Sequence, residues 1–370
     1  MSDAVVVGAG VIGCMTACRL AELGWGVTLI DADSPPAGTT AATHSNLSIY
    51  NRSPGPELDL AIETAMYYKA MMCDGFGEVG YEELGGALLI ADDDDIPAAQ
   101  RRIDHQRSAG IPCELVDTAT LRRSEPSIGE TARAAITSAG SAVVYAPGIV
   151  HALLRRGARA GVDVRPFTTL VDASREQSHW RLRTDRGELT TEHVVIAAGA
   201  RAGDIAALFG VDLTITPVRG HIVITTRQPR RGLPMLGEFV NRERHGTSHG
   251  GARLVWTHTP EGHVFIGRSS QPGVADPEVD VDVVRSVLDR ARHWLPDAAR
   301  MPVQRVYVGF RPQGPNGRPV VGADRASDGV WLAAGFGDIG IGLAAAGRHL
   351  ADRMNGGRTP LLDPYAPLTS

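Results

Sequence analysis

The first apolar positions of the chain form two short runs on either side of a longer stretch rich in Ala and Leu. Residues 4–7 and 27–30 are continuous apolar runs of the length expected for buried strands. The stretch between them has the pattern of a helix that reaches Leu23 and ends at Gly24. This order predicts a β–α–β unit, in which a helix connects two parallel strands of one sheet.

The turn between the first strand and the helix contains three spaced glycines, in the order Gly8-Ala9-Gly10-Val11-Ile12-Gly13. We expect Gly8 to permit the tight turn, Gly10 to leave space for a diphosphate, and Gly13 to let the helix pack closely on the strand. Free N–H groups at the helix N-terminus favour phosphate. Asp31 follows the second strand, where a carboxylate can accept hydrogen bonds from ribose hydroxyls. The segment therefore predicts a dinucleotide-binding site.

Strand-like and helix-like patterns alternate along the rest of the chain. Amphipathic or proline-bounded stretches predict helices over residues 57–72, 97–109, 115–126, 149–160, 280–294 and about 341–354. Short apolar runs predict strands over residues 81–90, 143–145, 162–167, 170–173, 180–184, 188–190, 193–198, 217–226, 253–258, 263–267, 304–309, 320–322 and 330–334. The Pro- and Gly-rich residues 311–319 predict a loop.

The length of the chain and the order of these elements predict two domains. The strand at 193–198 is expected to return to the first sheet, whereas residue 217 begins a second strand-rich region. The predicted fold class is α/β, with a Rossmann-like dinucleotide-binding domain and a discontinuous, mixed-sheet α+β substrate domain. The first domain is assigned to residues 1–75, 140–216 and 305–370, and the substrate domain to residues 76–139 and 217–304.

Charge and composition narrow the range of partners. A net charge of −5 gives no reason to expect a nucleic acid. The glycine-rich residues 330–347 include Asp338, so no membrane span is expected. The cysteines lack a metal or redox spacing, and Cys14 and Cys18, on one face of the first helix, are interpreted as core residues. This cysteine usage, and a first strand with no leader before it, favour a cytoplasmic protein.

Several motifs then match one family. They are the N-terminal glycines, the Gly38-Thr39-Thr40 loop, the strand ending in Ala197-Ala198-Gly199-Ala200, and the later stretches Pro217-Val218-Arg219-Gly220, Gly309-Phe310-Arg311-Pro312 and residues 335–340. With them, nearly the whole chain resembles the D-amino-acid oxidase-like flavoproteins, a group that includes glycine oxidase, sarcosine oxidase and D-amino-acid dehydrogenases. The resemblance implies FAD rather than NAD, an FAD-binding first domain, and an enzyme that oxidises an amine or amino acid.

The expected FAD-binding residues come from two arguments. The glycine fingerprint gives those near the N-terminus. The resemblance adds the hydroxyl-rich loop, the strand end and the C-terminal helix start, whose N–H groups are implied to face the flavin pyrimidine. The full set is Gly8, Gly10, Val11, Ile12, Gly13, Asp31, Ala32, Thr39, Thr40, Thr43, His44, Ser45, Ala198, Gly199, Gly337, Asp338, Ile339, Gly340 and Ile341.

Non-covalent FAD is expected, because two attachment sites known in the family lack a counterpart. No cysteine follows Cys113, whereas sarcosine oxidases attach FAD through a cysteine near the C-terminus. His44 is two residues out of register with the histidine that attaches FAD in dimethylglycine dehydrogenases. No metal is expected.

The resemblance also implies that Arg311 binds the carboxylate of the substrate, which a guanidinium can hold through two parallel hydrogen bonds. An inter-domain salt bridge is the alternative role. Tyr307, on the same predicted strand, and His258, on the predicted hairpin of the second domain, are further catalytic candidates. Other side chains near these strands receive no role: His221, His245, His249 and Trp256.

The implied reaction is oxidation of the C–N bond of an amino acid or N-substituted amino acid. Hydride passes from carbon to flavin N5, and the resulting imine hydrolyses. Oxygen or another acceptor takes the electrons, but the only lysine, Lys69, is a poor match for the oxygen-activating lysine of sarcosine oxidases. Two alternatives stay open: a flavin dehydrogenase subunit that passes electrons to a partner or quinone, and a non-catalytic flavin-binding protein.

Overall fold

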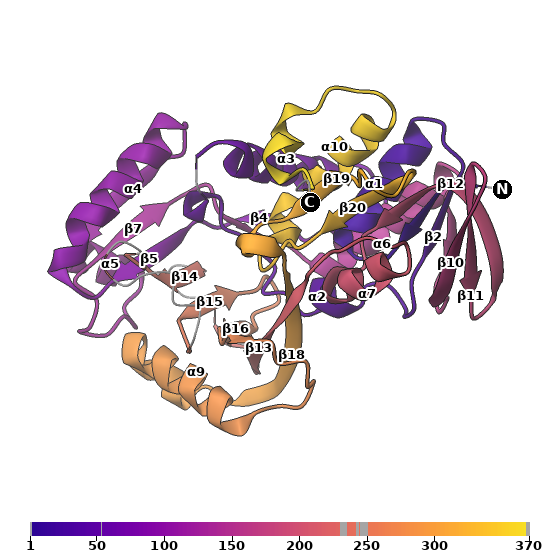
Figure 1. Cartoon of the computed structure of the whole chain (residues 1–370). Helices are drawn as coiled ribbons and strands as arrows, with labels where there is room; N and C mark the ends of the chain where they lie inside the picture. Colours follow the sequence, from indigo (N-terminus) through magenta and orange to yellow (C-terminus); the bar gives the residue numbers. More distant parts are fainter. Residues whose placement is uncertain (1, 53, 230–234, 242–243, 245–250, 368–370) are drawn as a thin grey trace.

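Two large mixed sheets and one small sheet organise the chain in the computed structural model (Figure 1). The structure describes residues 2–52, 54–229, 235–241, 244 and 251–367. Helices pack on both large sheets, so the predicted α/β class is confirmed.

The first sheet contains eight strands and is built around β1 (Ser2–Val7). β1 pairs in parallel with β2 (Val27–Ile30) on one side and β12 (Gly187–Ile196) on the other. α1 (Val11–Glu22) connects β1 to β2, which confirms the predicted β–α–β unit. β12 includes most of the strand predicted to return to this sheet. The other strands are β9 (Asp163–Arg165), β10 (Leu170–Glu176), β11 (His179–Thr184), β19 (Val320–Ala323) and β20 (Val330–Ala334).

α1 packs against two other helices as well as the sheet. It contacts α6 (Ala146–Arg159) and α10 (Ala345–Met354). The contact with α10 is close because of Gly347, where a Cβ would lie 2.8 Å from the carbonyl oxygen of Ile12. The C-terminal helix is therefore fixed to the segment that contains the glycine fingerprint.

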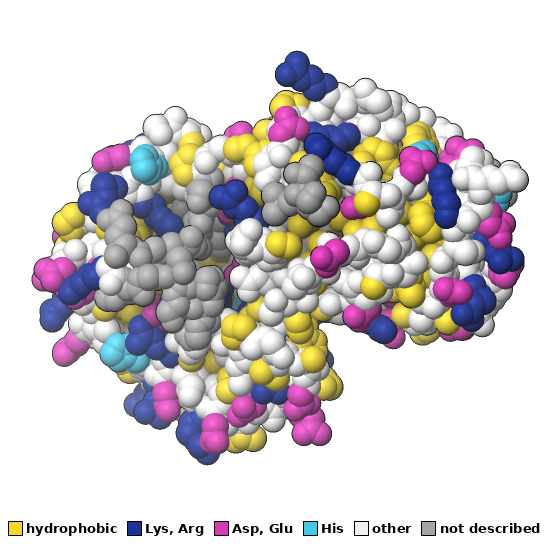
Figure 2. All heavy atoms as spheres, viewed as in Figure 1, with side chains coloured by type: hydrophobic (Ala, Val, Ile, Leu, Met, Phe, Trp, Pro, Cys, Tyr) yellow, Lys and Arg dark blue, Asp and Glu magenta, His cyan; other side chains and the backbone are white. Residues whose placement is uncertain are grey.

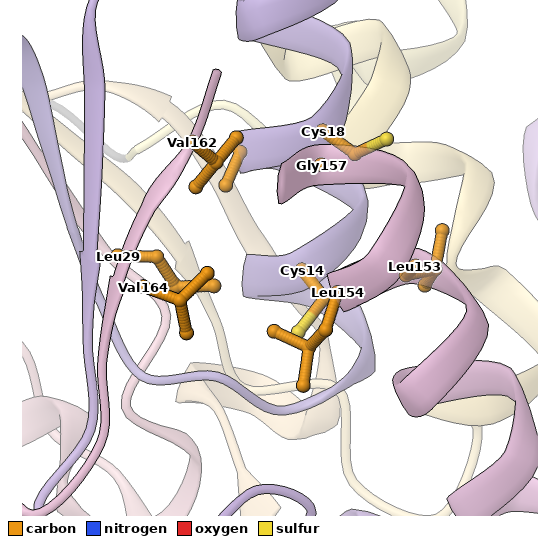
Figure 3. Close-up of a pocket in the computed structure, with 9 residues that line it drawn as sticks. Cys14, Cys18, Leu29, Leu153, Leu154, Gly157, Val162 and Val164 are labelled. Atoms are coloured by element: carbon orange, nitrogen blue, oxygen red, sulfur yellow. The ribbon is translucent and has the colours of Figure 1, made fainter. Parts of the chain in front are cut away.

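Apolar side chains and two cysteines line the space between α1, α6, β2 and β9 (Figure 3). Cys14 and Cys18 are buried there. Burial raises the pKa of both thiols, that of Cys18 to about 12. Because only the thiolate is a good nucleophile or metal ligand, the interpretation of these cysteines as core residues is confirmed.

The second sheet contains nine strands, and β13 (Thr216–Thr225) pairs with three of the others. β18 (Val303–Gln313) pairs with β13 along the whole of β13. α9 (Val281–Trp294) covers one face of this sheet, where Val287 and Trp294 join its apolar core. The other strands are β5 (Gly86–Ile90), β6 (Cys113–Asp117), β7 (Ala134–Ser138), β14 (Met235–Glu238), β15 (Val255–His258), β16 (Val264–Gly267) and β17 (Gln271–Pro272).

Short elements complete the described part of the fold. The small sheet consists of β3 (Asn46–Leu47), β4 (Glu82–Glu83) and β8 (Ala142–Val143). The remaining helices are α2 (Gly38–Ala41), α3 (Pro56–Met71), α4 (Ile96–Ser108), α5 (Thr118–Ser124) and α7 (Ala202–Ala207).

The predicted loop over residues 311–319 is wrong at its start, because β18 continues to Gln313. Pro312 stands directly opposite Pro217 of β13. An antiparallel pair of the non-hydrogen-bonded type needs no N–H from either residue, so two facing prolines do not interrupt the ladder. Arg311 therefore lies on a strand, where its direction is fixed by the register.

Further predictions differ from the structure at the ends of elements, and in two of them residues belong to another type of structure. Residues 115–117 belong to β6, and the predicted helix is limited to α5. Tyr145 is the N-cap of α6 instead of the end of a strand. The division into domains stays a prediction, although β18, assigned from residue 305 onward to the first domain, pairs within the second sheet.

Side chains of both charges are interspersed on the face shown in Figure 2. No helix in the described part of the chain is long and apolar enough to cross a membrane.

We expect Gly13→Ala to destabilise the fold, because a Cβ at Gly13 would overlap the carbonyl oxygen of Gly8. Overpacking of this kind costs about 1–3 kcal/mol of unfolding free energy, and backbone atoms cannot move aside as a side chain can. Urea unfolding measures the change. Gly140→Ala is the matched control, since no heavy atom lies within 4 Å of its Cβ position. Equal stability of the two variants would contradict the close packing of α1 on β1.

Candidate functional site

The glycines after β1 create a backbone cradle that other residues could not form. Gly8 has a φ of +106°, and a Cβ there would lie 2.5 Å from the carbonyl oxygen of Ala197, at the end of β12. Gly10 is the N-cap of α1 and has no side chain to bond the N–H groups of the first turn. These N–H groups and the open backbone fit a diphosphate, as the sequence predicts.

Asp31 lies beside this cradle at the end of β2. Its Oδ2 accepts a hydrogen bond from the Ala9 N–H (2.6 Å), and its Oδ1 accepts one from the Asp33 N–H (2.9 Å). Ala32 lies between the two acids. A carboxylate has about four acceptor positions, so Asp31 keeps capacity for a ribose hydroxyl. The residues present therefore fit the dinucleotide expected from the sequence.

The hydroxyl-rich loop after β2 joins the cradle to the second sheet. Thr40 Oγ1 accepts from the Val11 N–H (3.2 Å), and Thr39 Oγ1 donates to the Phe310 carbonyl on β18 (2.5 Å). Ser45 has a φ of +63°, and its N–H donates to Thr43 Oγ1 (3.1 Å). Of the predicted residues after β12, Gly199 meets the same loop, since a Cβ there would lie 3.9 Å from Thr39 Oγ1. Ala198 lies beside the cradle, where its Cα is 2.9 Å from the Cβ position of Gly8.

The register of β13 and β18 decides which side chains face this loop. Tyr307, Gly309 and Arg311 alternate along one face of β18, opposite Ile222, Gly220 and Val218 of β13. The Tyr307 hydroxyl donates to the Thr43 carbonyl (3.1 Å). This face of the second sheet is therefore turned toward the hydroxyl-rich loop.

Three glycines leave this face without side chains at its centre, and we call them the glycine floor: Gly220, Gly267 and Gly309. A Cβ at Gly220 would lie 2.5 Å from Arg311 Nη1, and one at Gly309 would lie 2.5 Å from the Ala42 Cβ. A Cβ at Gly267 would overlap the His44 ring at Nε2. The missing side chains thus give space to Arg311, Ala42 and His44.

Arg311 lies partly buried on the glycine floor. Its Nη1 donates to the Ser269 carbonyl (3.0 Å), and no carboxylate of the described residues lies within 4.0 Å of its guanidinium. Burial and the nearby Arg268 lower the pKa of Arg311 to about 10. The guanidinium is still protonated at neutral pH, and most of its five N–H donors remain available to an anion.

A second arginine at the site is already paired. Arg268, directly after β16, holds Asp338 through an ion pair of 2.5 Å between Nη1 and Oδ2. Burial would raise the pKa of Asp338, but Arg268, Arg311 and Arg52 lower it to about 2. Asp338 is therefore ionised, and its negative charge is balanced mainly by the guanidinium of Arg268.

Asp338 lies just before the predicted C-terminal helix, which begins later than the predicted residue 341. The chain forms a 3₁₀ helix, η6 (Gly340–Leu343), before α10 begins. The Ile339 N–H donates to the Phe336 carbonyl (3.0 Å), and the Ile341 carbonyl accepts from the Tyr68 hydroxyl (2.9 Å). Gly337 is held on β18 by a bond from its N–H to the Pro312 carbonyl (2.7 Å). The segment is thus brought to the site, but as a tight turn.

His44 lies at the meeting point of the loop and the second sheet. Both of its ring nitrogens are buried and have no hydrogen-bond partner among the described residues. Burial lowers its pKa to about 3, and the charges of Arg311 and Arg268 act in the same direction. The imidazole is therefore neutral over the ordinary pH range.

The structure does not bring His258 to the site. His258 and Trp256 alternate onto the face of β15 that packs toward α9, and His258 Nε2 lies 3.3 Å from the Gln228 carbonyl. His221 also lies on that face, where its Nε2 accepts from the Asp280 N–H (3.0 Å). The other two histidine candidates, His245 and His249, are outside the described residues.

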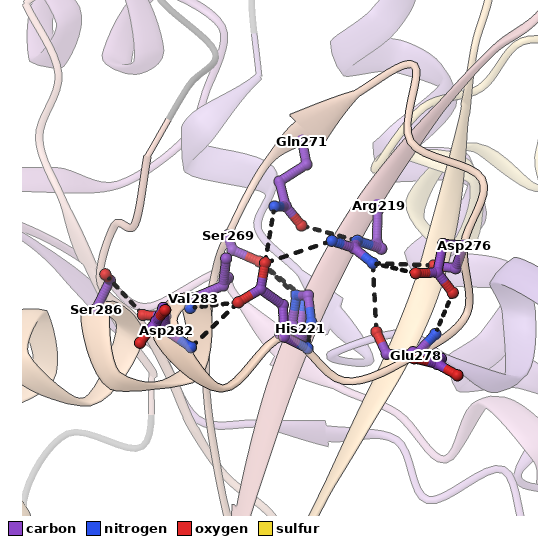
Figure 4. Close-up of polar contacts among 10 residues, drawn as sticks. Arg219, His221, Ser269, Gln271, Asp276, Glu278, Asp282, Val283 and Ser286 are labelled. Carbon is purple, nitrogen blue, oxygen red and sulfur yellow. Dashed lines mark hydrogen bonds and ion pairs between the residues drawn. The ribbon is translucent and has the colours of Figure 1, made fainter.

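Polar contacts behind the sheet hold the end of β16 in place (Figure 4). Arg219 bonds Gln271 Oε1 (2.8 Å) and pairs with Asp276 and Asp280 (3.5 Å each). Ser269 Oγ accepts from the His221 N–H (2.8 Å), while the Ser269 carbonyl holds Arg311 on the other side. Sequence analysis did not identify Ser269, because its role depends on strand register and no local motif marks it.

Comparison with known proteins agrees with this geometry. The family model named DAO, FAD dependent oxidoreductase, matches residues 3–353. The chain is 27% identical to a glycine oxidase of Geobacillus kaustophilus over 92% of this chain and 89% of that protein. It is 28% identical to a glycine oxidase of Pseudomonas aeruginosa over 98% of each chain. The crystal structure of the Geobacillus kaustophilus glycine oxidase matches it with a TM-score of 0.88 and 25% identity, over 100% of this chain and 99% of that one.

We expect His44 to make the protein sensitive to mild acid. A histidine whose pKa falls from about 6.5 unfolded to about 3 folded binds fewer protons in the folded state. The resulting contribution to the free energy of unfolding is complete above about pH 6.5 and is lost progressively as the pH falls from there toward about 3. At pH 5.5 this loss amounts to about 1.4 kcal/mol. His44→Leu should therefore lose less stability than the parent between pH 7.5 and 5.5 in urea unfolding.

The matched control is His105→Leu, the same change at an exposed position of α4. It should retain the acid sensitivity of the parent. If His44→Leu were as acid-sensitive as the parent, the ring would accept its proton in the folded protein, and the neutral state argued above would be wrong.

Proposed function

This chain belongs to the DAO family of FAD-dependent oxidoreductases, and we propose that it oxidises the C–N bond of a small amino acid or N-substituted amino acid whose carboxylate is bound by Arg311. FAD is the cofactor of the family, and when bound it supplies the acceptor for the hydride that leaves the substrate carbon. Glycine-oxidase-like oxidation of amines at family level is supported by the relatives. The substrate class is our own inference from the site.

One observation carries the proposal: Arg311 is a partly buried cation with a single described protein acceptor and no carboxylate partner. Leaving charged donors without partners is unfavourable, so the site favours an anionic ligand. A carboxylate can accept two parallel hydrogen bonds from the guanidinium, which would fix the orientation of the α-carbon. Asp338 does not fill this role, because Arg268 holds it.

The cradle after β1 would hold the FAD diphosphate, and Asp31 the ribose. The loop from Thr39 to Ser45, the Ala198–Gly199 turn and the Gly337–Ile341 segment would surround the flavin. These placements are supported by the glycine geometry and by the joining of loop and strand at Thr39 and Tyr307. We further propose that the FAD is held without a covalent bond.

The proposed reaction uses few protein groups. The amine of the substrate is neutral when its carbon loses hydride, and the nitrogen loses a proton as the imine forms. Water then adds to the imine, which releases an oxo acid and ammonia, or an aldehyde and a smaller amine. The protein contributes orientation and electrostatics, and no acid–base residue is required if the amine binds neutral.

We expect Arg311→Met to lower kcat/KM for amino-acid substrates roughly 30- to several-thousand-fold, because breaking a buried charged pair on one side costs about 2–5 kcal/mol. The measurement is anaerobic bleaching of the yellow holoenzyme by glycine, sarcosine and a set of D- and L-amino acids. FAD content should be unchanged. The matched control is Arg300→Met, whose side chain is 88% exposed, and it should react like the parent.

Normal turnover by Arg311→Met would rule out the carboxylate role. A parent protein that holds FAD but is bleached by none of these compounds would instead favour a non-catalytic flavin protein. If bleaching is normal but reoxidation by oxygen is slow, a dehydrogenase that passes electrons to a partner is favoured.

A further inference from the structure

His44 lies at the glycine floor, and its ring nitrogens make no hydrogen bond to the described residues. Both ring nitrogens are buried, yet neither has a hydrogen-bond partner among the described residues. A buried donor or acceptor without a partner is costly, and such groups in native structures usually await a ligand or water. The ring also occupies the space that a Cβ on Gly267 would fill, so it is positioned within the site.

Neighbouring polar groups are already engaged. The Tyr307 hydroxyl donates to the Thr43 carbonyl (3.1 Å), and Asp338 is paired with Arg268 (2.5 Å). The Thr257 hydroxyl, on the site face of β15, donates to Asn46 Oδ1 (2.7 Å). Each of these three groups therefore has a described partner, whereas neither ring nitrogen of His44 has one.

Burial and the charges around the ring keep His44 neutral. Arg311 of β18 and Arg268 after β16 oppose a positive imidazole, and Asp338 of the 337–341 segment acts weakly the other way. Burial is the largest effect, and together these keep the pKa near 3. A neutral imidazole has one nitrogen that accepts and one N–H that donates.

We propose that His44 accepts a hydrogen bond from the neutral amine of the substrate while Arg311 binds its carboxylate. This inference rests on the function proposed above and names the group that recognises the amine. His44 acts as an acceptor and takes no proton, so the ammonium form loses its proton to solvent before the amine binds. The substrate then needs an N–H in its neutral form, which favours primary and secondary amines over tertiary ones.

The test measures the binding of two carboxylates that have no amine to be oxidised. Glycolate places a hydroxyl donor where glycine has its amine, and acetate has no donor there. Each is titrated into the oxidised holoenzyme, and the Kd is taken from the change in flavin absorbance. We expect His44→Leu to raise the Kd of glycolate about 5- to 150-fold, the range for a buried group left unpaired, and to leave the Kd of acetate essentially unchanged.

Three controls separate recognition of the hydrogen-bond donor from damage to the fold. His44→Gln keeps an acceptor and should retain most of the preference for glycolate over acetate. The FAD content of each variant reports folding and cofactor binding independently of the carboxylates. Arg311→Met should weaken both carboxylates, since each presents the same carboxylate group.

Several outcomes would overturn the inference. An equal loss of affinity for glycolate and acetate in His44→Leu would make His44 a shape-determining residue only. Loss of FAD with an unchanged glycolate preference would make it a cofactor contact. If both carboxylates bind through Arg311 but His44 does not distinguish them, this inference fails and the proposed function stands. If neither carboxylate binds the parent and Arg311→Met has full activity, the proposed function fails as well.

Discussion

The antiparallel pairing of β13 with β18 is the constraint on which the candidate site depends. Its register sets Arg311 opposite Val218 and Gly309 opposite Gly220, so the guanidinium lies over backbone that has no side chain. The same strand is joined to the N-terminal half by the Thr39 hydroxyl and by Tyr307. A shift of one residue would turn Arg311 toward α9 and expose Phe310 to the loop, because side chains alternate along a strand.

The two faces of the second sheet have different polar chemistry. On the α9 face, Arg219 and His221 find partners in Asp280 and the segment after β16. On the loop face, Arg311 and His44 are left with unused donors or acceptors. Ser269 links the faces, since its hydroxyl bonds the His221 N–H and its carbonyl bonds Arg311. The hydrogen-bonded residues on the α9 face therefore help to hold Arg311 in position on the loop face.

The sequence predicts the parts of the structure that are local in the chain. The turn from Gly8 to Gly13 is fixed by the space that each glycine must leave free, and its β–α–β context is found within a few residues. FAD and the amine-oxidising class follow from the family resemblance that this turn and the later motifs carry. The role of Arg311 stays a prediction, which is supported by a guanidinium with one described acceptor, the Ser269 carbonyl.

What the sequence could not predict depends on register or on distant pairs. His258 was a catalytic candidate because its strand lies near the site, but the alternation along β15 turns it toward α9. The Arg268–Asp338 pair joins residues 70 positions apart and has no local signal. Pro312 suggested a loop, since a proline normally ends a strand, and only its pairing with Pro217 makes the continued strand possible.

The Arg268–Asp338 pair also explains why one arginine, and not two, is open to a ligand. Burial is the main reason that the pKa of Arg311 is lowered, and repulsion from the neighbouring Arg268 guanidinium lowers it further. With Asp338 ionised on Arg268 and His44 neutral, the described groups at the glycine floor leave about one positive charge near Arg311. A carboxylate compensates that charge, and a second cationic group on the ligand would then lack a free anion. The electrostatics therefore favour an amino acid whose amine has already lost its proton, which is the form that can give up hydride.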